Sequence, residues 1–245
     1  MIVATDFFEN IFNVTGGAKY HWSAFKNLSR WQAFKDDLNV WMQNWKPQAE
    51  GLVIVGPSAG YLLKDELLVL YLNRFKKIEA WDIDPLSRYF FKFRHPTIAN
   101  HMDWINGDWF QQKLISQSSL KNQAYLFTGV LGQLTHVMND RDHQLYFEAL
   151  KRLTQDVPFL SFHDRLLSQA PFDSLSPLTS DHHLQSNDLV KHFWGNPVNH
   201  THKLNGSLKI EEYDVGELHL NAKSFFYGAW PLRQNQNHVI EGFFN

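Results

Sequence analysis

The segment Gly56-Pro57-Ser58-Ala59-Gly60 contains the first residues whose types and spacing could do chemistry. It follows the apolar run 52–55 and precedes leucines at helical spacing, so it joins a strand to a helix. Small residues let the backbone approach a ligand, and a helix N-terminus supplies unpaired N–H donors. The turn therefore predicts a nucleotide-cofactor site, although chain geometry alone can also require glycine at such a junction.

A carboxylate, Asp82, ends the next apolar segment, residues 77–82. It follows the turn at the interval typical of an acid that accepts hydrogen bonds from both hydroxyls of a ribose. Asp84 is the competing carboxylate, but it directly precedes Pro85, a position that favours an N-cap. The turn and the acid indicate the same crevice, and we expect Asp82 to be the ribose ligand.

A third polar turn, Asn106-Gly107-Asp108-Trp109, follows the next expected strand. Asp108 could accept a hydrogen bond from an adenine amino group while Trp109 covers the ring. The three turns together favour a site for an adenosine-containing cofactor.

The elements that must position these residues follow from hydrophobic periodicity. Segments 52–55, 77–82, 124–128 and 157–163 predict strands, with helical patterns between them. Strands that alternate with helices imply parallel pairing and a sheet covered on both faces. Residues up to 165 therefore predict a doubly wound α/β domain.

Helical spacing also defines apolar faces outside these strands. Trp31, Phe34, Leu38, Trp41 and Trp45 share one face of a helix, which we interpret as core within an N-terminal helical cap, residues 1–48. The helix opened by Pro85 should place Leu86, Tyr89, Phe90 and Phe93 on one face, and another helix should run from about Asn139 to Leu153. Residues 49–245 should form the Rossmann-like domain, with antiparallel strands near 207–213, 223–230 and 238–243.

Composition narrows the possible partners. The 245 residues fit one large domain, and 23 Lys and Arg against 25 Asp and Glu, with no basic run, argue against nucleic acid as the main partner. The first residues lack the basic segment of a signal peptide, and no apolar run is long enough for a membrane helix, so we expect a cytoplasmic protein. Cysteine is absent, which excludes disulfides and thiolate chemistry.

Four segments, VIVGPSAGYLL, IEAWDIDP, INGDWF and YLFTGVLGQL, resemble in order and spacing the class I S-adenosylmethionine-dependent methyltransferases. The resemblance implies a Rossmann-like fold with S-adenosylmethionine as cofactor. It also implies that the glycine turn wraps the methionine part, Asp82 holds the ribose and Asp108 contacts adenine. The candidate cofactor contacts are Gly56, Pro57, Ser58, Gly60, Tyr61, Asp82, Ile83, Asp108, Trp109, Thr128 and Gly129.

The chain departs from that family at three places. Ile54 stands where an acidic residue usually precedes the glycines, and Ser58 replaces the middle glycine. The fourth strand ends in Thr128-Gly129 rather than in the Asp/Asn-Pro-Pro-aromatic signature of many amino-methylating enzymes. Methylation of DNA bases or amide nitrogens is disfavoured accordingly.

His163 is the candidate general base, because it ends the fifth predicted strand at the carboxyl edge of the sheet. The competing interpretation is a histidine held by hydrogen bonds at a strand end. Residues 165–206 predict a long loop, which we interpret as a lid with Phe193 and Trp194 as its latch. The loop contains His182, His183, His192, His200 and His202, but their spacing is not that of a dedicated metal site, so we predict no metal.

The sequence thus predicts an S-adenosylmethionine-dependent methyltransferase acting on a small-molecule acceptor. One alternative is a protein of this fold that binds the cofactor without catalysis. Another is an NAD-dependent oxidoreductase, disfavoured because Tyr61 stands where the dinucleotide fingerprint needs its last glycine. The acceptor and the oligomeric state are left open.

Overall fold

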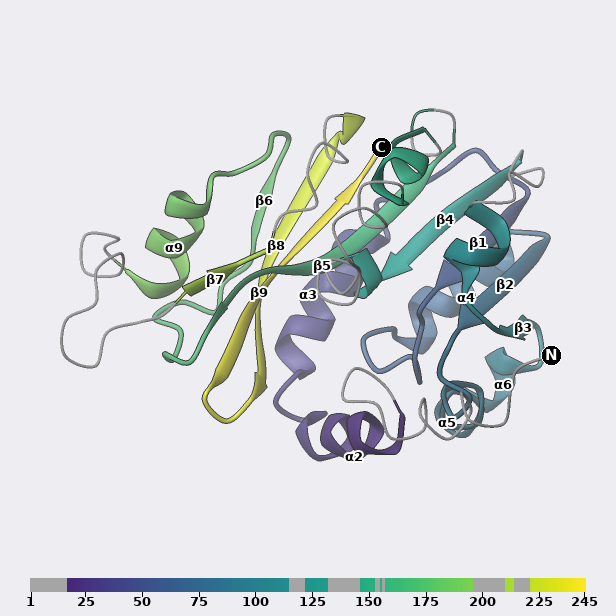
Figure 1. Ribbon diagram of the computed structural model, residues 1–245, viewed down its shortest axis with the longest axis horizontal. Coiled ribbons are helices and arrows are strands. Elements are labelled where there is room, and N and C mark those ends of the chain that lie inside the picture. The colour runs from purple at the N-terminus through teal and green to yellow at the C-terminus, as the bar shows by residue number, and fades with distance from the viewer. Residues whose placement is uncertain are drawn as a thin grey trace.

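The computed structural model describes residues 17–114, 122–131, 146–152, 155, 157–195, 210–213 and 221–245. Within them the chain folds around one mixed sheet with strand order β3-β2-β1-β4-β5-β9-β8-β6, and β7 pairs with β5 (Figure 1). The strands are β1 (Gly51–Val55), β2 (Lys77–Asp82), β3 (Asp103–Asn106), β4 (Gln123–Thr128), β5 (Phe159–Ser168), β6 (Leu178–Ser180), β7 (Ile210–Glu212), β8 (Ser224–Arg233) and β9 (Gln236–Phe244).

The parallel half of the sheet contains β3, β2, β1, β4 and β5. Its strands form at the predicted apolar runs, because both faces of the sheet are covered and nearly every residue of β1 and β4 is buried. The chain order reverses between β1 and β4, so their carboxyl ends form the switch point where doubly wound sheets bind ligands. The predicted Rossmann-like α/β fold is confirmed.

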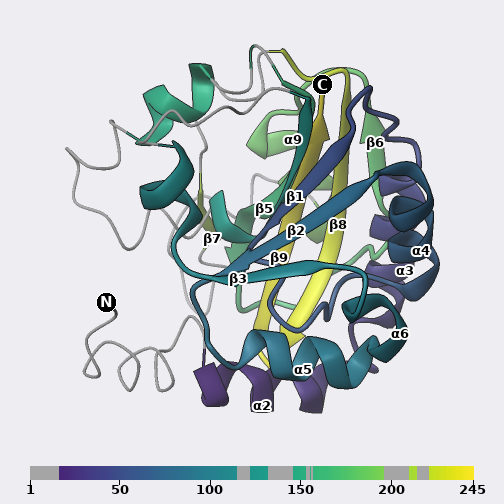
Figure 2. The same cartoon turned by 90° about the vertical axis from the view of Figure 1, so that its right-hand side faces the viewer.

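Helices cover both faces of this sheet. One face carries α3 (Gln32–Met42), α4 (Asp65–Arg74) and α6 (Pro96–Ala99), and the other carries α9 (Ser186–Trp194) and a π-helical turn (Phe110–Leu114) (Figure 2). Each face buries its own hydrophobic core: Ile54 belongs to the first core and Val55 to the second. Among the helices that the structure describes, none is both long enough and apolar enough to cross a membrane.

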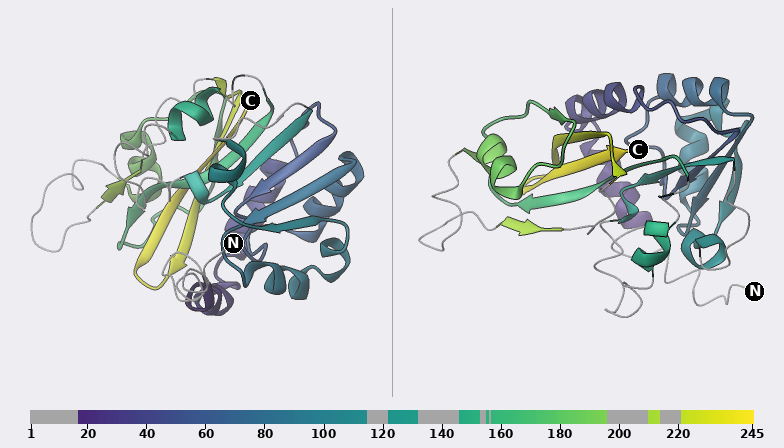
Figure 3. Two further views of the ribbon diagram at one scale, coloured as in Figure 1. Left: turned by 45° about the vertical axis from the view of Figure 1, so that its right-hand side comes forward. Right: turned by 90° about the horizontal axis from the view of Figure 1, so that it is seen from above.

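The antiparallel half is an extension of β5. β4 pairs with β5 only as far as Thr128 opposite Phe162, whereas β5 continues to Ser168 alongside β9, with a bulge between Asp164 and Leu166. β9 lies between β5 and β8, and the three strands extend together beyond the parallel strands (Figure 3). The predicted antiparallel C-terminal strands are therefore confirmed.

The aromatic stripe of the N-terminal cap is core, as expected. Trp31, Phe34, Leu38, Trp41 and Trp45 are all buried. The rings of α3 lie on the antiparallel half: Trp41 stacks on Phe226 with centroids 5.5 Å apart, and Phe34 stacks on Trp230 at 5.8 Å. The N-terminal cap and the C-terminal strands therefore share one hydrophobic core.

Two predicted helices differ from the structure. The helix after the glycine turn begins at Asp65 instead of at the turn, because residues up to Leu63 close successive tight turns through their backbone N–H groups. In α5 (Ser87–Arg94), which Pro85 was expected to open, Phe91 is the buried aromatic residue, packed against His95 and Trp104. The apolar face predicted from spacing is not the buried one: Tyr89, Phe90 and Phe93 are exposed and Leu86 is only half-buried.

The predicted helix from Asn139 to Leu153 lies partly outside the described residues, and residues 146–152 are helical.

The segment predicted as a loop, residues 165–206, is largely regular where it is described. It contains the end of β5, all of β6 and α9, while residues 196–209 lie outside the described part. The prediction that Phe193 and Trp194 form a latch over the crevice is wrong. Both residues are buried in the second core and pack on Phe172. Their burial follows from the apolar face of α9, which packs on the sheet.

Glycine at position 242 of β9 should be required by the close approach of α3. A Cβ atom there would meet two Trp41 ring atoms at 2.8 and 2.9 Å, whereas a Cβ atom at Gly51 has its nearest neighbours at 3.6 and 3.7 Å. Gly242→Ala should therefore lower the free energy of unfolding by about 1–3 kcal/mol, as overpacking does. Gly51→Ala should cost nothing. Urea denaturation compares the two variants, and equal losses would contradict this packing.

Candidate functional site

The glycine turn lies at the carboxyl ends of β1 and β4. Gly56 and Gly60 have φ of +71° and +64°, and Ser58 between them has φ of +51°. Glycine adopts this left-handed region freely, whereas a serine does so at a cost of about 1 kcal/mol or more. The Thr128 hydroxyl donates to the carbonyl of Val55 at 3.0 Å and lies 2.5 Å from that of Gly56. We call Gly56–Gly60, Asp82, Thr128 and Gly129 the switch-point site.

Asp82 holds the turn from the end of β2. Its Oδ2 accepts the Ser58 N–H at 2.8 Å, and its Oδ1 accepts the Asp84 N–H at 2.9 Å. A carboxylate offers about four acceptor positions; the two N–H groups and the Ser87 hydroxyl use part of them, and the rest stay open for a ligand. The side chain is 7% exposed, which places it at the floor of the site.

Burial also shifts the ionisation of Asp82. Loss of solvent raises the pKa of Asp82 to about 6, although the N–H groups of Asp84 and Ser58 oppose the rise. The carboxyl is therefore ionised at neutral pH and protonated in mild acid.

Asp84 docks the helix α2 (Gly17–Asn27) onto the site. Its Oδ2 accepts the Gly17 N–H at 2.5 Å and lies 3.1 Å from His21 Nε2, while its Oδ1 accepts the Leu86 N–H at 2.9 Å. Burial alone would raise the pKa of Asp84, but hydrogen bonds from His21 and from these N–H groups hold this pKa below its ordinary value. The predicted N-cap role of Asp84 is wrong, because α5 (Ser87–Arg94) has Leu86 at its N-cap position and no side-chain cap hydrogen bond; Asp84 instead anchors the N-terminal cap.

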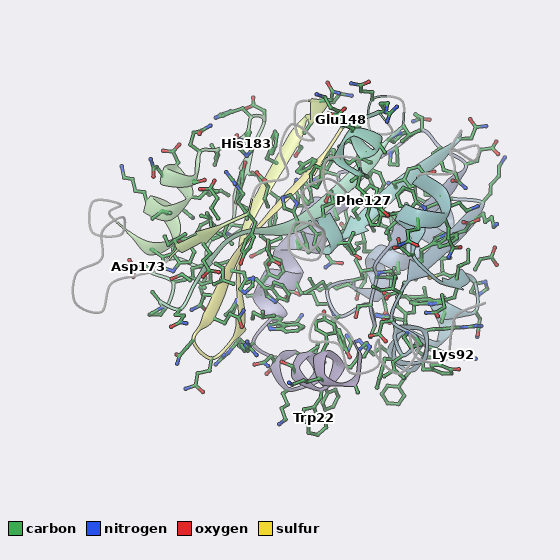
Figure 4. All side chains as sticks on the ribbon, viewed as in Figure 1. Trp22, Lys92, Phe127, Glu148, Asp173 and His183 are labelled. Carbon is green, nitrogen blue, oxygen red and sulfur yellow. The ribbon has the colours of Figure 1, made fainter. Side chains whose placement is uncertain are left out.

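Two tyrosines, Tyr20 of α2 and Tyr61 after the glycine turn, lie between α2 and the site. Tyr61 is buried, its hydroxyl is 2.9 Å from His21 Nδ1, and burial raises the pKa of that hydroxyl to about 12. Tyr20 is partly buried, and burial raises the pKa of its hydroxyl, with the charges of Asp82 and Asp164 adding to the rise. Trp22, on the other side of α2, is exposed and points outward (Figure 4). The inner face of α2 therefore covers the switch-point site.

Two features show room for a ligand's polar groups at the site. The Ser58 Oγ atom is buried beside the Tyr20 hydroxyl, and a hydrogen bond between them opposes the rise in the pKa of Tyr20. A Cβ atom placed on Gly129, whose φ is +75°, would meet no atom of the described residues within 4 Å. A hydroxyl pair beside open space at the end of β4 can offer both donors and acceptors to a ligand.

The remaining predicted contacts divide into rim and core. Ile83 is 56% exposed beside Asp82, and Asp108 is half-buried, where its Oδ1 accepts the Gln111 N–H at 3.2 Å. Trp109 is 2% exposed and packs on Tyr125 and Phe127. The ring is part of the second core, so its predicted role as a cover for adenine is wrong.

His163, the predicted base, points away from the switch-point site. Alternate residues of a strand face opposite sides of the sheet, and His163 is fully buried against Phe243 in the second core. Its Nε2 lies 3.4 Å from Glu241, which also lies 3.0 Å from His183. Burial would raise the pKa of Glu241, but hydrogen bonds from the two histidines hold this pKa far below its ordinary value. His163 is therefore a core residue, which corrects its assignment as a base.

Sequence reasoning missed Tyr20, His21 and His238. Tyr20 and His21 precede the aromatic stripe in a segment with no motif, and His238 is separated from its partner Asp164 by 74 positions. Only the polarity of Asp164 at a strand end signalled this region. Within the described residues, no three His, Asp or Glu side chains are placed to hold a metal ion. His200 and His202 lie outside that part.

Searches for related proteins found no matching family model and no matching curated protein. Among solved structures, an O-methyltransferase family protein from Burkholderia thailandensis matches 59% of this chain and 41% of its own at 12% identity, with a TM-score of 0.39. The N,N-8-amino-8-demethyl-D-riboflavin dimethyltransferase of Streptomyces davawensis matches 55% and 37% at 17% identity, with a TM-score of 0.37.

A third structure is PKMT2 from Rickettsia typhi in complex with AdoHcy, which matches 49% of this chain and 21% of its own at 10% identity, with a TM-score of 0.33. The chain thus spans less than half the length of each of these proteins. A likeness at this level assigns no residue and no activity, so the function is argued from the chain's own geometry.

The pKa of Asp82 predicts how cofactor binding depends on pH. Only the ionised carboxylate can accept two ribose hydroxyls, so the affinity for an adenosine cofactor should fall about tenfold for each pH unit below about 6. Asp82 protonation cannot cause this by unfolding, since a carboxyl whose pKa is raised on folding makes the fold more stable once protonated. Calorimetry at several pH values measures the slope, and a flat profile would contradict the role of Asp82.

Proposed function

We propose that the chain binds S-adenosylmethionine at the switch-point site and transfers its methyl group to a small-molecule acceptor. Asp82 carries the proposal, because it is the floor carboxylate of the described site that keeps accepting capacity after binding two backbone N–H groups and the Ser87 hydroxyl. Two vicinal hydroxyls of a ribose match these positions. Hydrogen bonds to a charged acceptor contribute about 1.5–3 kcal/mol each.

The glycine turn fits the amino acid end of the cofactor. Gly56 and Gly60 let the turn close against Val130 and His95, where a Cβ atom would clash, and the Ser58 hydroxyl between them lies beside Tyr20, where a polar group of the ligand could meet both. The adenine end fits the rim, where Ile83 offers exposed apolar surface and Asp108 a carboxylate. The residues present therefore suit an adenosyl sulfonium better than an extended dinucleotide.

The bound cofactor would supply a methyl group on a positively charged sulfur, which an aligned nucleophile can accept. The chain's own part is to align and to exclude water. Gly129 leaves open space at the end of β4, next to the turn, where an acceptor could approach. Tyr20 and Tyr61 cover this region from the side of α2.

Two features of the site bear on the class of acceptor: the charge of its lining and the helix that covers it. Asp82, Asp108 and Asp164 give the edge a negative lining, which repels the phosphates of a nucleic acid. The helix α2, docked through Asp84, limits the space above the site. Both features favour a small acceptor without negative charge.

Calorimetry with S-adenosylmethionine, S-adenosylhomocysteine and NAD tests the cofactor. The two adenosyl ligands should bind, and Asp82→Asn should weaken their binding at least tenfold, because one lost charge-assisted hydrogen bond is worth about 1.5–3 kcal/mol. Asp103→Asn is the matched control: it removes the same charge from a side chain that is 63% exposed and pairs with Lys77. Its affinity should equal that of the unaltered chain.

Three results would each change the interpretation. Tighter binding of NAD than of the adenosyl ligands would replace the methyltransferase with a dinucleotide enzyme. An equal loss in Asp82→Asn and Asp103→Asn would remove Asp82 from the site. Cofactor binding without turnover across a broad panel of acceptors would leave a binding protein without catalysis.

A further inference from the structure

A histidine and a carboxylate form a pair beside the switch-point site. His238 of β9 places its Nδ1 atom 2.6 Å from Oδ1 of Asp164 on β5. β5 and β9 lie side by side, and both residues follow the point where β4 has ended. The pair therefore stands at the carboxyl edge of the sheet, beyond the end of β4.

The pair lies on the same face of the sheet as α2 and α3. Asp164 follows His163 directly and so faces the opposite side of the strand. The ring of His238 packs against Trp230, which in turn contacts Trp31 and Phe34 of the first core. The Tyr20 hydroxyl feels the charges of both Asp82 and Asp164. Tyr20 thus connects the ribose end of the site with the His238–Asp164 pair.

The hydrogen bonding fixes the state of the histidine ring. A carboxylate can only accept, so the proton between the two residues belongs to Nδ1 of His238. The other ring nitrogen, Nε2, is buried and has no hydrogen-bond partner within the described residues. It therefore presents a lone pair, in a side chain that is only 5% exposed. A ring oriented by a carboxylate with its far nitrogen bare is the arrangement of a general base.

The groups around the pair complete its electrostatic setting. Asp164 is the carboxylate on β5, Tyr20 faces it from α2, and burial together with the charges of Glu211 and Asp164 raises the pKa of Tyr213 to about 12. Both tyrosines therefore stay neutral. The indole N–H of Trp230, beside His238, is also buried without a partner in the described part of the chain.

We propose that His238 is the base that takes the proton from the methyl acceptor, with Asp164 as its positioning residue, and that the acceptor group is a hydroxyl. The inference rests on the proposed methyl transfer. As the acceptor oxygen forms a bond to the methyl carbon, the carbon–sulfur bond breaks and its electron pair goes to sulfur, which leaves S-adenosylhomocysteine. The hydroxyl proton moves to Nε2 of His238.

A hydroxyl matches the two unpartnered nitrogens of this region. It can donate to a bare ring nitrogen and accept from an indole N–H, whereas a tertiary amine or a thioether has no proton to give. Methylation of a tertiary amine or a thioether needs no base, so His238 would have no role in it.

The first experiment needs no acceptor. In ¹⁵N-histidine NMR of the full chain, the His238 signals, assigned by their loss in His238→Gln, should show the proton on Nδ1 and none on Nε2. Asp164→Asn should move the ring away from this tautomer. A proton found on Nε2 of the unaltered chain would overturn the proposal.

The second experiment measures turnover of labelled S-adenosylmethionine with a panel of phenols and alcohols, beside a panel of tertiary amines and thioethers. His238→Gln should lower kcat for the hydroxyl acceptors about a hundredfold or more and Asp164→Asn about tenfold, with the cofactor Kd unchanged. The loss should be smaller for more acidic phenols, which need less help from a base. His182→Gln, at a side chain 73% exposed, is the matched control and should keep full activity.

The outcomes separate this inference from the function on which it rests. If the unaltered chain binds no adenosyl ligand, the proposed function fails. If it binds the cofactor but methylates amines or thioethers alone, or if His238→Gln keeps full turnover with intact cofactor affinity, the base is wrong and the function stands.

Discussion

The Asp82 carboxylate is nearly buried, and the N–H groups of Ser58 and Asp84 stabilise its charge there. These two bonds tie the glycine turn after β1 to the end of β2. The turn can therefore keep left-handed backbone at three positions, including the strained Ser58, because the carboxylate holds it in place. Every other part of the switch-point site is arranged around this one group.

The neighbouring carboxylate has the opposite environment and a different task. Asp84 gains a histidine and two backbone N–H groups, which hold α2 over the site. Asp82 and Asp84 thus have different roles. Asp82 keeps accepting capacity for a ligand, whereas the oxygens of Asp84 bind groups of the protein itself. The difference arises because β2 ends between them, so that one faces the turn and the other faces the N-terminal cap.

The sequence predicts those parts of the fold that depend on local patterns. The apolar runs of β1, β2 and β4 and the stripe on α3 form where expected, since a buried strand or helix face needs them. The buried face of α5 could not be predicted, because Phe91 and its neighbour Phe90 are equally apolar and only packing on His95 and Trp104 distinguishes them. His163 and Asp164 show the same limit, since adjacent strand residues face opposite sides and the position of β9 decides which side meets the site.

The position of β9 also matters while the chain is being synthesised. β9 fills the space between β5 and β8, although it follows all the other strands in the sequence. A nascent chain on the ribosome completes β1 to β5 long before residues 236–244 emerge. Until then the edge of β5 that will pair with β9, from Leu160 to Ser168, presents unpaired N–H and C=O groups. Chaperones or slow release should therefore influence the yield of folded protein more strongly than for a sheet whose last strand is added at its rim.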